Sequence, residues 1–224
     1  HTIIDVIAVG GGFADALRES RYRMVASRKV YLLDPSSQAH ADHDNVKRDE
    51  RLMRRTGYDV VDSKDFTDAD IARVTELYRR LYLNKHSRLN PQFNERFFSL
   101  TLKANILSCR AMKRNGQIDA FAAYYRQGEV LTGTAVGYDL GLPVKLGLYR
   151  LAMGMLIAEA RASGQRVNLS AGAGAFKVLR GAWPNVELEA VYDRHLPYHR
   201  RLAWRYLAAG SMLQHPRLAR WLRW

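Results

Sequence analysis

Three strand-like segments that follow one another with very short connections constrain the fold of this 224-residue chain most strongly. The segments cover residues 105–113, 117–126 and 129–138, and the turns at 115–116 (Asn-Gly) and 127–129 (Gln-Gly-Glu) join them. Connections this short link antiparallel neighbours, because parallel neighbours need a crossover of a dozen or more residues. The sequence therefore predicts an antiparallel meander.

Helices are expected before and after this meander. Thr67 and Asp70 have the spacing of a capping box that opens a helix, and a second helix follows Pro91. A mostly apolar helix is expected at about 147–163. The remaining elements are short strands at 58–61, 166–170 and 187–193 and a short helix at 174–181. This order predicts a mixed, mostly antiparallel α/β (α+β) fold rather than an alternating doubly wound one.

The N-terminal part of the chain has a different pattern. Residues 1–35 are predicted to form a strand, a helix and a second strand, and the polar segment 36–44 is the best linker in the chain. His40 and His43 lie in this linker and are expected to be solvated. A strongly basic helix is expected next, with Gly57 as its C-cap.

Charge and cysteine content exclude several classes of protein. The formal net charge is +13, from 35 Lys and Arg against 22 Asp and Glu. A single cysteine, Cys109, excludes an internal disulfide and a multi-cysteine metal cluster, and is typical of a reducing compartment. No apolar run reaches 18 residues, so a transmembrane span is not expected. A cytoplasmic location follows, with a peripheral position at the inner membrane surface as a further interpretation.

The third strand of the meander has an unusual face. Strict alternation places Leu131 on one side together with three small residues, Gly133, Ala135 and Gly137. Small residues on one face leave room for a thin ligand beside the backbone, or for a closely packed helix. The loop after this strand runs into the apolar helix, whose N-terminal N–H groups and Lys145 can hold a phosphate.

A small-residue loop then joins the strand at 166–170 to a helix that carries Lys177. With the helix GLYRLAMGMLIAEARASG before it, this region resembles the FemAB/CelD-type (BioF-like) branch of the GNAT acyltransferases, whose pattern here is Asp-Phe-x-x-Gly-x-x-x-Tyr-Lys. Gly172 and Lys177 match that pattern. Asn168 stands where an aspartate is usual, and Phe176 replaces the usual tyrosine. The resemblance spans roughly residues 43–193.

The resemblance implies a GNAT-like split sheet flanked by helices, with acetyl-CoA or another acyl-CoA as co-substrate and no metal. The thioester would lie between the strands at 129–138 and 166–170, and its pyrophosphate would meet residues 142–148. The cofactor-binding residues predicted in this way are Gly133, Ala135, Gly137, Leu142, Val144, Lys145, Leu146, Gly147, Leu148 and Asn168.

The chemistry implied is transfer of an acyl group to an amine. This reaction needs donors for the tetrahedral oxyanion and a proton or positive charge for the leaving thiolate. Lys177 is predicted to stabilise the developing anion or bind an anionic substrate, Tyr138 to protonate the thiolate, and Asp139 to relay the proton of the amine. Each has a structural alternative: a solvated helix lysine, a packing aromatic residue and a turn aspartate.

The resemblance also implies a domain organisation, because FemAB-like proteins contain two such domains in tandem. Residues 1–40 are then the end of a truncated first domain, and 41–57 form a basic connecting helix. Residues 58–194 form the acyltransferase domain, and 195–224 form a basic helical tail. This tail is rich in Arg and Trp and suits an anionic membrane surface or a tRNA backbone.

Three other interpretations remain open at this point. In the first the donor is aminoacyl-tRNA instead of acyl-CoA, and in the second the chain is a catalytically inactive module that binds nucleic acid or a membrane. Alternatively, Gly10-Gly11-Gly12 after a strand, with Asp34 closing the next strand, imitates the dinucleotide-binding turn of an oxidoreductase. Asp15 departs from that motif, since it stands where a small residue is required.

Overall fold

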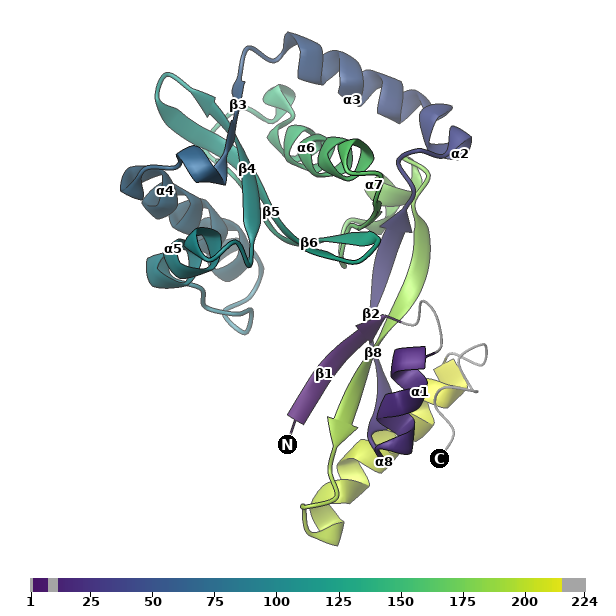
Figure 1. Ribbon diagram of the computed structural model, residues 1–224. Helices are drawn as coiled ribbons and strands as arrows, with labels where there is room; N and C mark the ends of the chain where they lie inside the picture. Colours follow the sequence, from purple (N-terminus) through teal and green to yellow (C-terminus); the bar gives the residue numbers. More distant parts are fainter. Residues whose placement is uncertain (1, 8–11, 215–224) are drawn as a thin grey trace. The chain divides into compact units, whose positions relative to one another are not determined.

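The computed structural model describes residues 2–7 and 12–214 and divides them into two compact units (Figure 1). The first unit takes its residues from 1–31, 171–174 and 184–224, and the second unit comprises 32–170 and 175–183. Residues 184–194, which the sequence pattern joins to the acyltransferase domain, thus contribute to the first unit. The expected origin of residues 1–40 in a truncated domain stays a prediction.

The predicted meander forms the centre of the second unit. Its strands lie in the order β7-β6-β5-β4-β3, and the last two residues of β2 pair with the outer side of β7. All neighbours are antiparallel except β6 and β7, which run parallel. The bounds are β2 (Arg23–Leu33), β3 (Asp59–Asp62), β4 (Ser108–Arg114), β5 (Gln117–Gln127), β6 (Val130–Tyr138) and β7 (Arg166–Asn168). The mixed, mostly antiparallel sheet is confirmed.

Helices cover both faces of this sheet (Figure 1). One face packs on α4 (Asp68–Tyr78) and α5 (Glu95–Lys103) through an aromatic-rich core cluster that includes Phe98 and Phe121. The other face packs on α6 (Leu148–Ala162), and α3 (Asp44–Arg55) lies against α6 in turn. Two short 3₁₀ turns, η1 (Ser63–Asp65) and η3 (Val144–Leu146), and the short α7 (Gly174–Val178) complete the connections.

The capping box predicted at Thr67 is confirmed. The Thr67 hydroxyl accepts a hydrogen bond from the Asp70 N–H at 3.2 Å, and the Asp70 carboxylate accepts one from the Thr67 N–H at 3.0 Å. After α4 the chain continues directly as a π-helix, η2 (Arg79–His86). Sequence periodicity did not distinguish this segment from the preceding helix, although π-helices are rare and are often found at functional sites.

A β-bulge divides the row of small residues on β6. Ala135 pairs with Ala123 and Gly133 pairs with the next residue, Tyr124, so Thr134 is an extra residue on β6. An added Cβ at Gly133 would meet Leu156 of α6, whereas one at Gly137 would meet the ring of Phe121 in the opposite core cluster. The expectation of one continuous face of small residues is therefore wrong, because the bulge interrupts strict alternation.

In the first unit, β8 (Trp183–Tyr192) pairs antiparallel with β1 (Thr2–Ile7) and lies between β1 and β2. The helices α1 (Gly12–Glu19) and α8 (Tyr198–Gln214) belong to the same unit. Because β8 separates β1 from β2, these strands do not form the adjacent parallel pair of a dinucleotide-binding unit. That interpretation is wrong, and Gly10 and Gly11 themselves lie outside the described residues.

The polar segment 36–44 is not a solvated linker. It contains a short helix, α2 (Gln38–Ala41), and His40 on this helix is only 1% exposed. The Nδ1 atom of His40 lies 2.7 Å from the carbonyl oxygen of Arg180 and donates to it. The polar composition of this segment gave no sign of the buried contact between His40 and Arg180, and the expectation of a solvated His40 is wrong.

The basic tail is helical as far as the structure describes it, in α8. Residues 215–224 lie outside the described residues, and with them the amphipathic Arg and Trp segment expected at 217–224. Among the helices of the described residues, none combines the length and the apolar character that crossing a bilayer requires.

Candidate active site

The sheet of the second unit splits between β6 and β7. The two strands pair at only three positions, from Val130 with Arg166 to Thr132 with Asn168. There β7 ends, while β6 continues to Tyr138, which still pairs with Ala120 on the β5 side. Beyond Thr132, the edge of β6 that faces away from β5 has no strand beside it in the described part of the chain.

The main chain of this open edge carries polar groups that no neighbouring strand of the described residues pairs with. The N–H of Val136 points away from β5 and donates to the hydroxyl of Tyr82 at 3.4 Å. Tyr82 comes from the π-helix η2. A hydrogen bond of this length is weak, so another acceptor can replace the tyrosine hydroxyl at low cost.

Aromatic side chains gather beside the split. The ring of Tyr149 lies 6.0 Å from that of Tyr138 and 4.9 Å from that of Phe176, and Lys85 Nζ lies 5.9 Å from the Tyr138 ring. Burial raises the pKa of Tyr149 to about 12, and the neighbouring Tyr138 and Tyr82 add to the shift. The Tyr149 phenol therefore keeps its proton at neutral pH and is a hydrogen-bond donor rather than a base.

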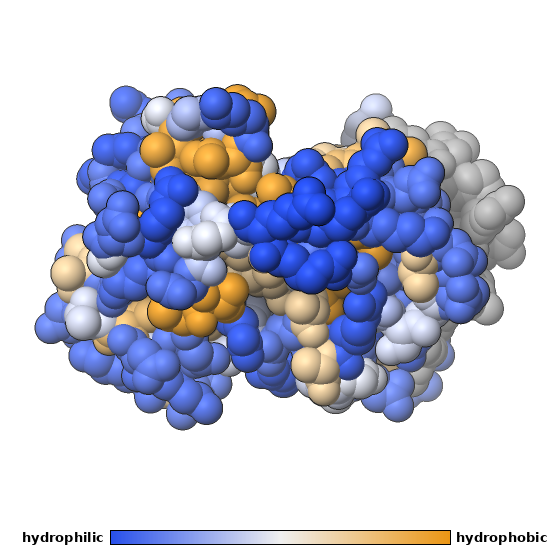
Figure 2. Space-filling view, turned by 90° about the horizontal axis from the view of Figure 1, so that it is seen from above, coloured by the Kyte–Doolittle hydropathy of each residue, from blue (hydrophilic) through white to orange (hydrophobic). Residues whose placement is uncertain are grey.

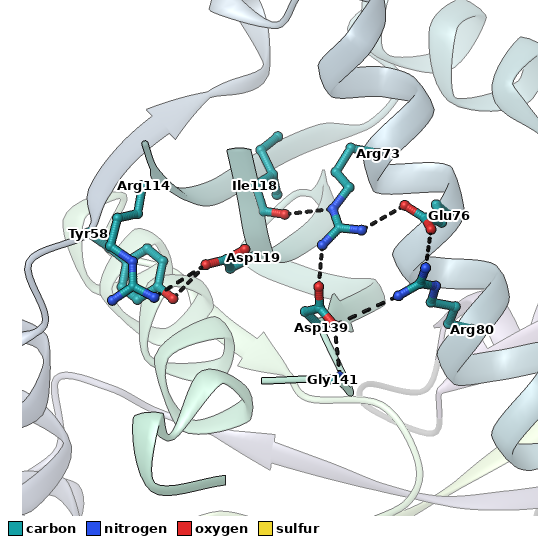
Figure 3. A network of polar contacts seen from close by, with 9 residues as sticks. All are labelled: Tyr58, Arg73, Glu76, Arg80, Arg114, Ile118, Asp119, Asp139 and Gly141. Carbon is teal, nitrogen blue, oxygen red and sulfur yellow. Dashed lines mark hydrogen bonds and ion pairs between the residues drawn. The ribbon is translucent and has the colours of Figure 1, made fainter. Parts of the chain in front are cut away.

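Asp139, directly after β6, is held by three groups (Figure 3). It accepts a hydrogen bond from the Gly141 N–H at 2.8 Å and forms ion pairs with Arg73 at 2.5 Å and Arg80 at 3.8 Å. Burial alone would raise the pKa of Asp139, but the bonds from Gly141 and Arg73 lower it below its ordinary value. A carboxylate fixed in this way has the geometry of a turn aspartate, and its role as a proton relay stays a prediction.

The loop between β6 and α6 exposes Lys145, the positive charge that was expected there. Val144 is 95% exposed and Lys145 beside it is exposed too, immediately before the first N–H groups of α6. Leu142, Leu146 and Leu148 instead pack in the core cluster under α6 and anchor the loop. Gly147 has a φ of +66°, a left-handed conformation that favours glycine, as the chain enters α6.

The chain after β7 is fastened by buried polar groups. Asn168 is 1% exposed, and its Oδ1 accepts a hydrogen bond from the Ser170 N–H at 2.9 Å. Lys177 is 2% exposed, and its Nζ donates to the carbonyls of Leu169 at 2.7 Å and Ser170 at 3.0 Å. Burial lowers the pKa of Lys177 to about 8. The alternative of a solvated helix lysine is therefore wrong, while a direct role at the reacting atoms stays a prediction.

The structure thus brings Tyr138 to the split and adds residues that sequence reasoning did not assign to a site. Tyr82, Tyr149 and Lys85 carried no motif in the sequence. The feature that marks Tyr82 is the π-helix in which it lies, and the periodicity of the sequence does not reveal a π-helix. In the described part of the chain, no three His, Cys, Asp or Glu side chains form a group suited to a metal ion.

Comparison with known structures gives the same fold. The chain superposes on L-PGS from Bacillus licheniformis with a TM-score of 0.59 at 16% identity, covering 92% of this chain and 72% of that one. For FemX the TM-score is 0.62 at 9% identity, covering 86% and 72%. The C-terminal domain of a protein described as a lysylphosphatidylglycerol synthetase, from Agrobacterium fabrum, gives 0.59 at 14% identity, covering 84% and 67%. At these identities the likeness shows the fold alone.

Comparison with curated protein sequences finds no match. A family model does match, and it covers more than half of the chain. Residues 42–178 match the model of the acetyltransferase (GNAT) domain, a range that contains the meander, α6, β7 and Lys177. The chain therefore belongs to the GNAT acetyltransferase family and is an acyltransferase.

Proposed function

We propose that this protein is an N-acyltransferase that moves an acyl group from acyl-CoA to an amine. The observation that carries the proposal is the parting of β6 from β7 after Thr132 and Asn168. A strand edge without a neighbour exposes N–H and C=O groups that need partners. The pantetheine arm of coenzyme A is thin and contains amide groups, so it can pair with this edge as an added strand would.

The loop before α6 supports the position of the phosphates. The first N–H groups of a helix are unpaired and carry partial positive charge, and the exposed Lys145 adds a full charge beside them. Both lie at the far end of β6, where the open edge leads. The donor would therefore run from this loop along the open edge of β6.

The reaction forms a C–N bond and breaks the C–S bond of the thioester. The neutral amine attacks the thioester carbonyl, and an edge N–H such as that of Val136 donates to the oxyanion after Tyr82 has moved aside. Tyr138 is the proposed proton donor to the leaving thiolate, and the amine finally loses its proton to solvent. Lys177 is proposed as a positioning residue, since its ammonium fixes the carbonyls of Leu169 and Ser170.

Titration calorimetry with acetyl-CoA, decanoyl-CoA and free coenzyme A tests this proposal. We expect binding of all three and a loss of about tenfold in affinity for Lys145→Glu, or about 1.4 kcal/mol. The matched control is Lys103→Glu, which reverses an exposed lysine at the end of α5 and should bind as the wild type does. Absence of binding to every acyl-CoA by folded protein would contradict the proposed donor.

Aminoacyl-tRNA is the second candidate donor, because the net charge of +13 favours a polyanion. Transfer of the aminoacyl group from a charged tRNA to a small amine, with steep salt dependence and no turnover of acyl-CoA, would identify aminoacyl-tRNA as the donor and contradict acyl-CoA. The proposal that the protein transfers an acyl group to an amine would be kept.

A further inference from the structure

A cavity of about 380 Å³ lies between α3 and α6, away from the split in the sheet. Val46 and Met53 of α3 and Ile157 of α6 form its apolar walls. The α6 residues that line it begin at Gly154, whereas the proposed phosphate position is at the start of this helix. Gly154 lies six positions after Leu148, a rise of about 9 Å along the helix, so the two sites are distinct.

Gly154 keeps part of this space empty. A glycine in the interior of a helix costs about 1 kcal/mol relative to alanine, so its presence usually has a packing reason. Here a Cβ added to Gly154 would meet Met53 at 3.6 Å, an ordinary contact distance. Close helix packing therefore does not demand the glycine, and its missing side chain widens the cavity instead.

The charged groups around the cavity leave an excess of positive charge at its rim. The buried Asp49 is neutralised by two arginines, with Arg150 at 2.7 Å and Arg180 at 2.6 Å. Glu50 faces Arg161 at 3.3 Å. Arg54 is exposed on the rim, and no carboxylate of the described residues forms an ion pair with it.

The outer face of α3 extends this positive charge. Figure 2 looks down on the side that carries α3 and shows strongly hydrophilic residues crossing it, with apolar residues next to them. The exposed basic residues of this helix are Lys47, Arg48, Arg51, Arg54 and Arg55. An apolar hollow under a basic rim matches a molecule with a short apolar chain and an anionic head.

We propose that the cavity between α3 and α6 binds a single-chain anionic amphiphile. Its chain lies between Val46, Met53 and Ile157, and its head contacts Arg54 and Arg161. A fatty acid and an alkyl phosphate share this chemistry. The site is independent of the acyl donor, because neither the open edge of β6 nor the loop before α6 contributes to it.

Calorimetric titration with dodecanoate and with dodecyl phosphate, each below its micellar concentration, tests the proposal. We expect saturable binding of one molecule, with the tighter of the two ligands identifying the head group. Dodecyltrimethylammonium, which has the same chain and the opposite charge, should bind at least tenfold more weakly. Equal binding of the cationic ligand would overturn the proposal.

Four variants locate the site. Gly154→Leu fills the cavity and should abolish binding. Ala158→Phe blocks its exposed rim without changing the helix interior, and serves where the first variant does not fold. Arg54→Gln should weaken binding about tenfold, whereas the control Arg48→Gln, on the same helix but not at the cavity, should not. Equal losses for Arg54→Gln and Arg48→Gln, or unchanged binding in a folded cavity variant, would show adsorption by charge alone and overturn the site.

Discussion

The two edges of β6 differ in how far they pair with a neighbouring strand. Toward β5 the strand is paired from Val130 to Tyr138, with one bulge at Thr134. Toward β7 it is paired only as far as Thr132. The same nine-residue strand is thus part of a closed core on one side, while on the other it has no neighbouring strand beyond Thr132 in the described part of the chain.

The difference shows where stability and function reside. On the closed side, Phe121 and Ala123 of β5 have no solvent exposure, and their neighbours on β6 are a glycine and an alanine. On the open side, an edge N–H is held only by the long hydrogen bond to Tyr82. Tight packing fixes the strand, and weak contacts leave its other edge available to a ligand.

The largest effect is expected from Gly137→Ala on the closed side. The added Cβ would lie 2.9 Å from Phe121 Cδ1 and closer still to Cε1, and the fully buried ring has little room to move. We expect a loss of about 3 kcal/mol in the free energy of unfolding, measured by chemical denaturation.

Phe121→Leu combined with Gly137→Ala serves as the control for this clash. The smaller side chain makes room for the new methyl group, so the double variant should lose less stability than the sum of the two single variants. A Gly137→Ala protein as stable as the wild type would contradict the close packing of this edge.

The closed edge was accessible to sequence reasoning because its signals are local. The turns at 115–116 and 127–129 predict the meander, and Thr67 with Asp70 predicts the start of α4; both are confirmed. The mostly antiparallel sheet followed from the resulting order of elements.

The geometry of the open edge was not accessible in the same way. The bulge at Thr134 adds one residue without a composition signal, and it moves Ala135 and Gly137 away from the side that Gly133 faces. The burial of Lys177 depends on the carbonyls of Leu169 and Ser170, and that of His40 on the carbonyl of Arg180. Such contacts depend on tertiary structure, which periodicity and polarity do not encode.

A second, smaller effect is expected from Lys177→Met on the far side of the split. Burial lowers the pKa of Lys177 to about 8 from its ordinary value of 10.5. Between these two values the unfolded chain keeps a proton that the folded chain has released, so stability rises with pH across this window. We expect the free energy of unfolding of the wild type to rise from pH 8 to pH 10 relative to that of the variant.

The exposed Lys103 provides the comparison for this pH dependence. Lys103→Met should keep the slope of the wild type, because it leaves Lys177 and its burial unchanged. A Lys177→Met protein whose unfolding free energy follows the wild type at every pH would show that the Lys177 ammonium is not desolvated, and that the chain after β7 is fastened by other contacts.

The smallest effect is expected from Tyr82→Phe at the open edge, and it tests most directly whether this edge receives the donor. The variant removes the hydroxyl that the Val136 N–H contacts, so an acyl-CoA carbonyl no longer has to displace it. A weak hydrogen bond of about 0.5 kcal/mol corresponds to a two- to threefold gain in acyl-CoA affinity, measured by calorimetry. Tyr125→Phe, which alters a ring packed on the α4 and α5 side of the sheet, should leave the affinity unchanged. Weaker binding by Tyr82→Phe would mean that the hydroxyl contacts the donor instead of competing with it. The open edge of β6 would then differ from the closed edge because Tyr82 supplies a donor-binding group there, and not only because a neighbouring strand is missing.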